Sequence, residues 1–424
     1  MSWPPFRESR PAVTPRIVIH GGAGKITHAN LTPSARYEYL SAISHILHTV
    51  HPRLAAGLSA LDTAVAAVRM LEDNPLFNAG KGAVFTLAGT NELEASVMVS
   101  RGQYKRCAGV YLLKHVKNPV LLAKEVLLHD DLSVERAARH TCLSGPYAEE
   151  LASRWGLEIV EQSYFFTQKR WQQHLQDLEK GPGVDVAGSS VADRVTGELA
   201  AADEKAERRV EVEEKEVHAD ADEHFGAVVE EYLPKGTVGC VVLDSSGVIA
   251  AATSTGGLTN KVPGRIGDTP TPGAGFWAEE WEVEPKTTSI VAGTIESLKQ
   301  GIASCWSGAT SPKPVKTYRA VGLSGTGNGD FFLRLSVCHN IAARCRFGGK
   351  PLRVAAREVS GPGGEIEKAG EGKGEPDGAV IGIDEDGEVI MEMNCGGCFR
   401  GTVDKDGRVL VAAFADEEPA ELAA

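Results

Sequence analysis

The first 155 residues alternate between the apolar spacing of strands and that of helices. A short apolar run at 16–20 is typical of a buried strand, and it leads into the glycine cluster Gly21–Gly24. A second strand is expected at 92–98. Apolar residues at helical spacing predict helices at 34–50, 59–73, 119–129, 133–141 and 146–155. This part of the chain is therefore expected to combine strands with helices.

Residues from about 175 to 230 have a different composition. They are rich in Glu, Asp, Lys, Ala and Ser and contain almost no aromatic residues. Such segments are usually solvated and often disordered, because they cannot bury enough apolar surface to fold. A single solvated helix at 198–217 is the alternative. In either case we expect a linker outside the core.

After this linker the pattern changes to the period of two that is typical of strands. Residues 237–244 and 248–255 flank a short turn and predict a β-hairpin. Further hairpins are expected around residues 384–387 and 404–407, and a helix is expected at 331–338. The second half of the chain is therefore predicted to be rich in strands.

The pair Gly236-Thr237 opens the first of these strands, directly after the acidic linker. A threonine here is usually only a good strand former, but a chain that cuts itself at this bond would expose Thr237 as an N-terminal nucleophile. Its freed α-amine, with a pKa of about 7.7–8.0, would act as the base, and Gly236 would tolerate a strained backbone at the bond to be cut. Counting outward from the hairpin turn places Thr237 opposite Ser254 or Thr255, and Thr253 shares a face with Thr255. A second hydroxyl is therefore expected beside Thr237.

Composition narrows the class of protein. The chain has 424 residues, 42% of them hydrophobic, and a formal net charge of −13, which argues against a nucleic-acid or anionic-membrane surface. It has neither a secretory signal at its N-terminus nor an apolar run of about 18 residues, so we expect no membrane span. Eight cysteines in a chain of this length suit a reducing compartment, here the cytoplasm. Cys395 and Cys398 have the spacing of half a zinc site, but no second pair matches them.

The loop Gly264–Asp268 holds Arg265 and Asp268 three residues apart between glycines. An arginine can bind a carboxylate through two hydrogen bonds, and an aspartate accepts hydrogen bonds from an ammonium group. Together they could bind both charged groups of an amino acid. A weak surface ion pair is the alternative.

A second glycine-rich loop, Gly325–Asp330, precedes the predicted helix at 331–338. Free N–H groups at the start of a helix can stabilise an oxyanion or a phosphate. Neither this loop nor Gly21–Gly24 is accompanied by the remaining residues of a dinucleotide or P-loop fingerprint. The loop therefore points to catalysis only if a nucleophile lies beside it.

These motifs, taken in order, resemble the plant-type L-asparaginase/isoaspartyl aminopeptidase family of N-terminal-nucleophile hydrolases. The matching segments are His20–Gly24, Phe77–Gly82, Glu92–Ser96, Gly236–Gly239, Ala252–Gly257, Gly264–Asp268 and Gly325–Gly329. The resemblance implies an α/β fold, the four-layer αββα sandwich. It also implies a cut that divides the precursor into an α chain, 1–236, and a β chain, 237–424, with two such αβ units forming a dimer. The implied substrates are L-asparagine and β-aspartyl dipeptides, which yield L-aspartate.

The resemblance also implies roles for individual residues. Thr237 is the implied nucleophile, Thr255 is its hydrogen-bonding partner, and Asn78 is its neighbour. Arg265 and Asp268 are the groups that bind the substrate carboxylate and ammonium. Thr326 and Gly327 form the oxyanion hole, and Gly329 is the glycine at which the substrate loop approaches the substrate closely. No cofactor is implied as a requirement. A structural sodium ion is implied at the main-chain carbonyls of Leu71, Glu72, Asn74, Phe77, Ala79 and Lys81.

Three departures from the family pattern stand out. Asn328 stands where many relatives have histidine, which would alter the polarity of the pocket, and Asp330 replaces a common glutamate. Ala88 occupies a site that is often acidic in relatives, with no evident consequence. Residues 279–319 form an expected insertion with a helix at 294–306, and we expect its ends to lie near the site. As a lid, it would oppose acidic leaving groups through residues such as Glu279 and Glu280, and it could pack Trp277 and Trp281 on apolar ones; a surface excursion is the alternative.

Other functions remain open at this stage. A glycosylasparaginase-like amidase or a threonine endopeptidase would share the nucleophile. The missing secretory signal argues against the first, and the paired grip for a small zwitterion argues against the second. From a different class, the chain could be an unprocessed scaffold that binds partners through its acidic linker, and a denaturing gel would distinguish this from a processed enzyme.

Overall fold

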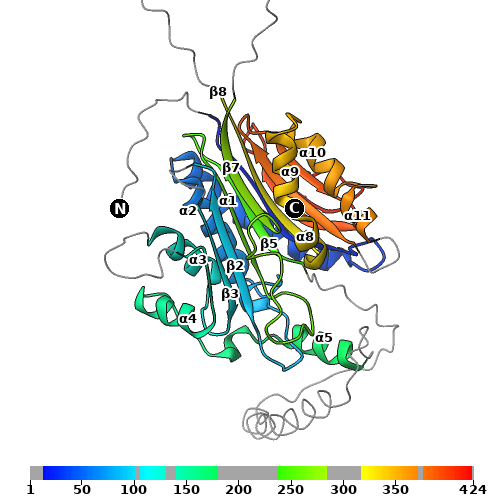
Figure 1. Ribbon diagram of the computed structural model, residues 1–424. Coiled ribbons are helices and arrows are strands. Elements are labelled where there is room, and N and C mark those ends of the chain that lie inside the picture. Colours follow the sequence, from blue (N-terminus) through cyan, green and yellow to red (C-terminus); the bar gives the residue numbers. More distant parts are fainter. Residues whose placement is uncertain are drawn as a thin grey trace, which may run out of the picture.

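Two β-sheets and the helices packed on them make up the described part of the chain (Figure 1). The computed structural model describes residues 13–101, 106–129, 140–179, 236–283, 317–370 and 376–422. The acidic linker between Glu179 and Gly236 lies outside the described residues. The same holds for the helix expected at 294–306 and for most of the one expected at 133–141.

The larger sheet has eight strands in the order β12-β11-β1-β5-β6-β2-β3-β4. These strands are β1 (Arg16–Gly24), β2 (Leu93–Val99), β3 (Arg106–Leu113), β4 (Cys142–Ser144), β5 (Val238–Leu243), β6 (Ile249–Thr255), β11 (Gly397–Val403) and β12 (Val409–Phe414). Neighbouring strands are antiparallel except β3 and β4. The central strands β5, β6 and β2 are buried along their whole length, because both faces of the sheet are covered.

The smaller sheet has four antiparallel strands in the order β10-β9-β8-β7. They are β7 (Phe276–Val283), β8 (Thr317–Gly327), β9 (Gly378–Asp384) and β10 (Val389–Met393). An apolar cluster joins the two sheets and contains Val18, Val241, Leu243, Ile249, Ala251, Ala320, Ile381 and Ile383. Burying a Val, Leu or Ile side chain stabilises a fold by about 1.5–3 kcal/mol, so this cluster holds the sheets face to face.

Helices cover the outer sides of both sheets (Figure 1). The core of the larger sheet includes residues of α1 (Pro33–Ala55), α2 (Ala60–Glu72), α3 (Pro119–Leu128) and α4 (Gly145–Arg154). The core of the smaller sheet includes residues of α8 (Gly329–Leu335), α9 (Val337–Arg346), α10 (Leu352–Ser360) and α11 (Glu365–Ala369). The 3-10 turns are η1 (Gly80–Gly82) and η3 (Gln162–Phe165), and α5 (Gln168–Glu179) is the last described element before the linker.

The expected helices and strands within the described residues coincide with these elements to within a few residues, with one exception. The helix expected at 331–338 is two helices, α8 and α9, joined at Ser336. Ser336 has a φ of 47°, in the left-handed region, which ends the first helix.

Strands β7 and β8 contain both ends of the expected insertion. Residues 279–283 complete β7 and residues 317–319 begin β8, so the described strands stop at Val283 and Thr317. These two residues pair at one end of the hairpin, whereas Phe276 and Ser324 pair near the other end. At roughly 3.3 Å per residue, Thr317 lies about 30 Å along β8 from Thr326. The expectation that the insertion's ends lie near the site is therefore wrong for Val283 and Thr317, because β7 and β8 carry the chain away from Thr326 along the sheet.

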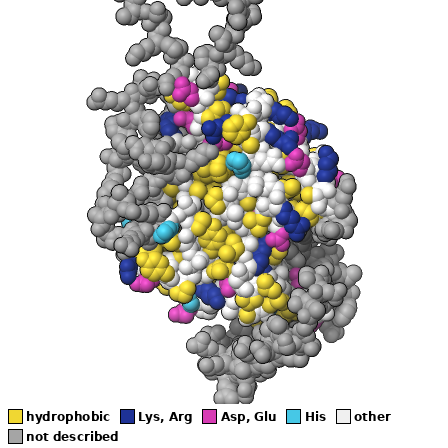
Figure 2. Space-filling model, viewed as in Figure 1, with side chains coloured by type: hydrophobic (Ala, Val, Ile, Leu, Met, Phe, Trp, Pro, Cys, Tyr) yellow, Lys and Arg dark blue, Asp and Glu magenta, His cyan; other side chains and the backbone are white. Residues whose placement is uncertain are grey.

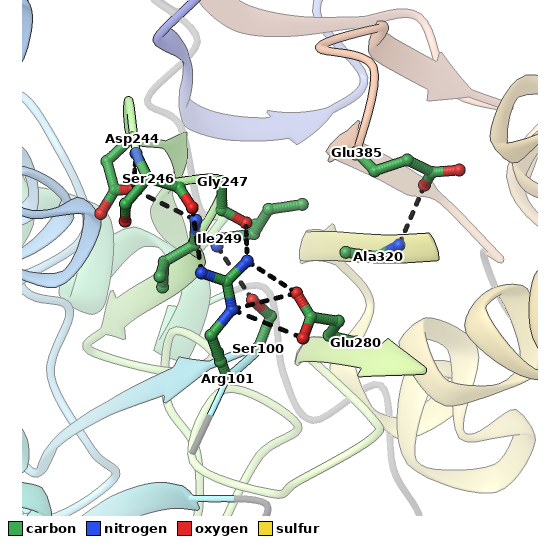
Figure 3. Close-up of polar contacts among 10 residues, drawn as sticks. Ser100, Arg101, Asp244, Ser246, Gly247, Ile249, Glu280, Ala320 and Glu385 are labelled. Atoms are coloured by element: carbon green, nitrogen blue, oxygen red, sulfur yellow. Dashed lines mark hydrogen bonds and ion pairs between the residues drawn. The ribbon is translucent and has the colours of Figure 1, made fainter. Parts of the chain in front are cut away.

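Glu279 and Glu280 of β7 contact arginine side chains of the protein itself. Two nitrogens of Arg101 donate to Glu280 Oε2 at 3.1 and 2.8 Å, and the same guanidinium donates to the carbonyls of Ser246 and Gly247 in the β5–β6 turn (Figure 3). Glu279 is almost fully buried and accepts from Arg346 Nη1 at 2.9 Å. The first residues of the expected insertion therefore belong to the structural core.

Charged side chains of both signs lie interspersed on the face shown in Figure 2, with apolar side chains between them. Within the described residues, no helix is both long enough and apolar enough to cross a bilayer.

Candidate active site

Thr237 lies immediately before β5 and is only 5% exposed. Val238 pairs with Ser254 across the hairpin, so one further step along the register brings Thr237 opposite Thr255. The Oγ1 atom of Thr237 lies 2.9 Å from Oγ1 of Thr269. The hydroxyl of Thr237 therefore has a hydroxyl partner in a buried setting.

Thr269 is a site residue that sequence reasoning did not identify. Its backbone carbonyl accepts hydrogen bonds from Ser96 Oγ on β2 (2.7 Å) and from Thr253 Oγ1 on β6 (3.1 Å). These two hydroxyls also contact each other. Because Thr269 directly follows Asp268, these hydrogen bonds connect the expected substrate-binding residue Asp268 to the nucleophile Thr237. Adjacency to Asp268 was the only signal in the sequence.

Thr255 was expected to hydrogen-bond the nucleophile, and here the structure differs. Its Oγ1 accepts the N–H of Gly257 at 3.0 Å, whereas the Thr237 hydroxyl pairs with Thr269. Gly257 has a φ of 82° and turns the chain sharply after β6, which brings its N–H back to Thr255. Strand register therefore sets the two threonines opposite each other, while the local turn decides where the Thr255 hydroxyl points.

Asn78 is fully buried and joins its loop to the end of β6. Its Nδ2 donates to the carbonyl of Gly257 at 2.8 Å, and its own carbonyl accepts from Gly256 N at 3.0 Å. Its Oδ1 accepts from Val84 N at 3.0 Å. These contacts hold Gly256 and Gly257, the two residues that follow Thr255. Asn78 therefore lies next to the end of β6, the strand that pairs with the start of β5.

Gly236 packs where no side chain fits. A Cβ atom at this position would lie 2.6 Å from Ala23 N, 2.6 Å from Thr326 Oγ1 and 2.9 Å from Ala23 O. The residue is not among the glycines with positive φ. Close packing, and not the backbone strain expected from the sequence, therefore explains the glycine: the bond before Thr237 is held against β1 and β8, and only glycine leaves room for it.

Thr326 and Gly327 end β8 next to this bond. Thr326 is almost fully buried, and its Oγ1 accepts the N–H of Ala23 at 3.2 Å. Gly327 has a φ of 139°, and a Cβ there would lie 2.2 Å from the carbonyl oxygen of Asp377. Asn328 follows as the N-cap of α8, with its Oδ1 accepting from Asp330 N at 3.3 Å. The oxyanion loop expected from the sequence thus lies against the bond before Thr237.

Arg265 and Asp268 approach each other around Gly329. A Cβ on Gly329 would lie 2.4 Å from Asp268 Oδ1 and 3.1 Å from Arg265 Nη2, so a larger residue would fill the space between them. Arg265 Nε and Asp268 Oδ2 are buried and have no hydrogen-bond partner within the part of the chain that the structure describes. Arg265 Nη2 contacts Asp330 Oδ1 at 3.1 Å. The unpaired donor and acceptor are complementary to the carboxylate and the ammonium group of an amino-acid zwitterion.

Burial raises the pKa of Asp268 to about 7, with Arg265 acting in the opposite direction. A carboxyl group with this pKa is easily converted to its charged form when an ammonium group arrives. Perturbed carboxyl groups of this kind are typical of functional sites.

Two carboxylates of the Glu92–Ser96 segment hold the loop that carries Arg265. Glu92 Oε2 accepts the N–H of Gly264 at 2.8 Å, and Glu94 Oε1 accepts the N–H of Gly267 at 3.1 Å. Burial raises the pKa of Glu94, and Lys261 opposes this effect. Lys261 is itself buried and donates to the carbonyl of Glu92 at 2.8 Å. Glu92 and Glu94, at the start of β2, therefore fix the loop that carries Arg265 and Asp268. This explains why the Glu92–Ser96 segment is part of the matching motifs.

The loop from Leu71 to Lys81 presents main-chain carbonyl oxygens. Those of Asn74, Phe77 and Ala79 accept the N–H groups of Phe77, Ala79 and Gly82, whereas that of Leu71 accepts from both Asp73 and Asn74. A carbonyl oxygen has two lone pairs, so one that accepts a single N–H can still coordinate a hard cation. Within the described residues, no cluster of three or more His, Cys, Asp and Glu side chains has the arrangement of a metal site. Any cation in this loop would therefore rest on main-chain oxygens.

Comparisons with known proteins leave unmatched the segment between the described ends of β7 and β8. A sequence model of a family described as asparaginase matches residues 13–284 and 316–412, which leaves 285–315 between β7 and β8 unmatched. An isoaspartyl peptidase of Escherichia coli (strain K12) is 33% identical over 384 residues, 91% of each chain. An isoaspartyl peptidase/L-asparaginase of Danio rerio is 31% identical over 269 residues, 62% of this chain and 67% of the relative. A plant-type L-asparaginase of Pyrobaculum calidifontis is 34% identical over 268 residues, 62% of this chain and 70% of the relative.

Proposed function

This chain belongs to the asparaginase family, and on that premise we propose that it is a self-processing threonine hydrolase. It hydrolyses the side-chain amide of L-asparagine and of β-aspartyl (isoaspartyl) dipeptides and releases L-aspartate. One observation carries the proposal: the buried Thr237 hydroxyl lies 2.9 Å from Thr269, the residue next to Asp268. Nucleophile and zwitterion grip therefore meet in one place.

Maturation begins with attack of Thr237 Oγ1 on the carbonyl carbon of Gly236. The C–N bond breaks, the nitrogen of Thr237 takes up the hydroxyl proton, and Gly236 is left as an ester on Oγ1. Water hydrolyses the ester, which restores the hydroxyl and frees the carboxyl of Gly236. The close packing of Gly236 against Ala23 and Thr326 supports this step, because it holds the bond still during attack.

The mature enzyme uses the same oxygen on its substrate. The free amine of Thr237 takes the proton from Oγ1 as the oxygen attacks the substrate's side-chain amide carbonyl. Thr326 and Gly327 stabilise the resulting oxyanion; removing one such donor costs about 3–4 kcal/mol in other hydrolases. The leaving ammonia or amino group takes the proton, and water then hydrolyses the acyl-enzyme to L-aspartate. Thr255 and Asn78 support the nucleophile from β6 and its neighbouring loop.

Arg265 binds the substrate's α-carboxylate, and Asp268 binds its α-ammonium group. The buried, unpaired Arg265 Nε and Asp268 Oδ2 support this assignment, because leaving a buried polar atom without a partner costs about 1–3 kcal/mol. Gly329 keeps the space between them open. Asp330 has to yield its contact with Arg265 when the carboxylate binds.

Further features of the family enter as proposals. The two stacked sheets with helices on their outer sides support a four-layer αββα sandwich of the N-terminal-nucleophile type. Residues 1–236 become the α chain and 237–424 the β chain, and two αβ units form a dimer. The free thiols among the described cysteines suit the cytoplasm. No cofactor takes part in the chemistry; a sodium ion on the carbonyls of Leu71, Glu72, Asn74, Phe77, Ala79 and Lys81 would only stiffen the loop that carries Asn78.

Mass spectrometry of the purified protein tests maturation. The wild type is expected to yield a fragment that begins at Thr237, and Thr237→Ala is expected to stay whole because it lacks the attacking oxygen. A wild-type chain that remains uncut after long incubation would remove the mechanism.

Turnover of matched substrates tests the reaction. We expect release of L-aspartate from L-asparagine and from β-aspartyl dipeptides, and a large loss of kcat/KM when the substrate's α-amine is acetylated, since Asp268 then has no ammonium to bind. Equal rates on free and acetylated dipeptides would contradict the zwitterion pocket and favour an endopeptidase. Arg265→Lys is expected to bind substrate more weakly, because lysine lacks the two-pronged geometry of the guanidinium.

A further inference from the structure

His20 is a buried polar residue with no role in the reaction steps proposed for Thr237. It lies on β1 and is fully buried. Its Nδ1 is 2.9 Å from the carbonyl oxygen of Thr237, and its Nε2 is 2.7 Å from Oγ of Ser324 on β8. The imidazole therefore connects the nucleophile's own backbone to a strand of the other sheet.

These two contacts define the protonation state of the ring. A carbonyl oxygen can only accept, so Nδ1 carries the hydrogen and donates it to Thr237. Nε2 is then the acceptor for the hydroxyl of Ser324. Burial lowers the pKa of His20 to about 3, so the ring is neutral at physiological pH, as this pattern requires. His20 therefore acts by holding a group in place and not by transferring protons.

The space for this contact is created by a glycine. Gly239 pairs with His20 across β1 and β5. A Cβ on Gly239 would lie 2.1 Å from Ser324 Oγ and 2.5 Å from His20 Nε2, so any side chain at 239 would displace one of them. The imidazole of His20 and the hydroxyl of Ser324 thus explain why the second glycine of the Gly236–Gly239 motif, Gly239, has no side chain.

The contact becomes important when the chain is cut. Thr237 then becomes a chain end, and the β5–β6 pairing begins only at Val238. Chain ends are poorly ordered unless they are tied down. Thr237 is tied at two places, at its carbonyl by His20 and at its hydroxyl by Thr269. With the carbonyl and the side chain both fixed, the chirality of Cα leaves one direction for the amine.

We propose that His20 is the positioning residue that aims the freed amine of Thr237 at its own hydroxyl in the mature enzyme. The inference rests on the proposed function, because it assigns a role only if the amine is the catalytic base. It predicts that loss of the Nδ1–H contact lowers kcat while substrate affinity stays almost unchanged, since Arg265 and Asp268 are untouched.

Two amide substitutions separate this contact from general packing. His20→Asn keeps an N–H close to the position of Nδ1 but cannot reach Ser324, whereas His20→Gln places its amide near Nε2 and leaves the Thr237 carbonyl without a donor. We expect His20→Gln to lower kcat about 100-fold, the effect of misplacing a catalytic group by roughly 1 Å. We expect His20→Asn to retain at least about a tenth of the wild-type kcat, and the Ki for L-aspartate to change less than about 3-fold in both.

Thr402→Val is the matched control for lost buried hydrogen bonding. Thr402 Oγ1 donates to the carbonyl of Ile17 at 2.7 Å, also on β1 but away from Thr237. The control is expected to lower the melting temperature without changing kcat. Activities are divided by the amount of β chain with a free N-terminal Thr237, so that slow maturation does not imitate slow catalysis. Equal kcat in His20→Gln and Thr402→Val, or equal losses in His20→Asn and His20→Gln, would overturn the proposal.

A third variant is needed if both His20 variants fold but are not cleaved, because kcat cannot then be measured on them. Ser324→Ala keeps the ring and its Nδ1–H bond to Thr237, so we expect it to mature with kcat within about 10-fold of the wild type. A folded Ser324→Ala chain that also stays uncut, or a mature one that loses as much kcat as expected for His20→Gln, would overturn the proposal. Failure of the proposed function itself would be seen separately, as a wild-type protein that neither matures nor releases L-aspartate.

Discussion

Thr269 and Asp268 are neighbours in the sequence, but their roles come from strands far away in the chain. Ser96 on β2 and Thr253 on β6 hold the Thr269 carbonyl, and this brings the Thr269 hydroxyl to Thr237. Asp268 is itself only 5% exposed. At this scale hydrogen bonds fix the short hydroxyl side chains of the site, whereas Asp268 Oδ2 and Arg265 Nε have no partner within the described residues.

The pKa of Asp268 gives a prediction at the residue scale. Burial raises it to about 7, so the carboxyl is mostly neutral below that pH and charged above it. Only the charged form binds the ammonium of L-aspartate strongly. The Ki for L-aspartate in the mature enzyme is therefore expected to fall as the pH rises from about 6 to about 8, roughly one unit on either side of the pKa, and then to level off.

Isothermal titration calorimetry at several pH values measures this dependence. Asp268→Asn is the control, because it cannot ionise and should bind weakly at every pH. An affinity that is flat between those pH values in the wild type would show that Asp268 is already charged in the empty site.

At the scale of elements, α5 is a support for two loops that border the site. Arg170 is 2% exposed, and its Nε donates to the carbonyl of Gly82 at 2.9 Å. His174 contacts Asn260 through Nδ1, and Asn260 Nδ2 donates to the carbonyl of His174 at 3.1 Å. The first loop carries Asn78 and the second leads to Arg265, so α5 stabilises both from outside the pocket.

Arg170→Met is expected to lower the free energy of unfolding by about 1–3 kcal/mol, because the carbonyl of Gly82 loses its buried donor. It should also slow maturation, since the loop of Asn78 loosens. Thermal denaturation and the rate of appearance of the Thr237 fragment measure the two effects. Arg170→Lys should be intermediate. Arg154→Met on α4, where the arginine is half exposed, should change stability by less than about 0.5 kcal/mol; an equal loss at both sites would refute the support role of Arg170.

The β7–β8 hairpin gives a second prediction at this scale. The described strands end at the pair Val283–Thr317, and Thr317 lies about 30 Å along β8 from Thr326. Replacing residues 285–315, which the family model leaves unmatched, with a short Gly/Ser linker is therefore expected to leave self-cleavage and the ranking of kcat/KM among β-aspartyl dipeptides and asparagine unchanged. A changed ranking would mean that the segment returns to the pocket.

At the scale of the whole molecule, the proposed cut after Gly236 would leave two interlocked chains. Strand β1 of the proposed α chain pairs with β5 and β11 of the β chain, and β2 pairs with β6. Many hydrogen bonds and a shared core therefore cross between the two products. Cutting one loop removes none of these contacts.

The two fragments are therefore expected to elute as one species in size-exclusion chromatography and to separate only on a denaturing gel. Thr237→Ala should elute at nearly the same volume as a single uncut chain. Separate elution of the two fragments of the wild type in native buffer would contradict the interlocked arrangement.

The sequence by itself determined the elements and the chemical candidates. Apolar periodicity located helices such as α1 and α2, and counting across a short turn gave the β5–β6 register to within one residue, because these signals depend on neighbours along the chain. The candidate motifs were readable for the same reason: Gly236-Thr237 and Gly264–Asp268 are local.

Tertiary structure decided which of these groups meet. It paired the Thr237 hydroxyl with Thr269 instead of Thr255, placed His20 on the Thr237 carbonyl, and gave Gly236 its role through contacts with Ala23 and Thr326. It also placed Val283 and Thr317, the described strand ends on either side of the expected insertion, away from the site. Each of these results depends on strands that are distant in the sequence and pair in an order that local spacing does not encode, and hydrogen-bond partners follow from that order.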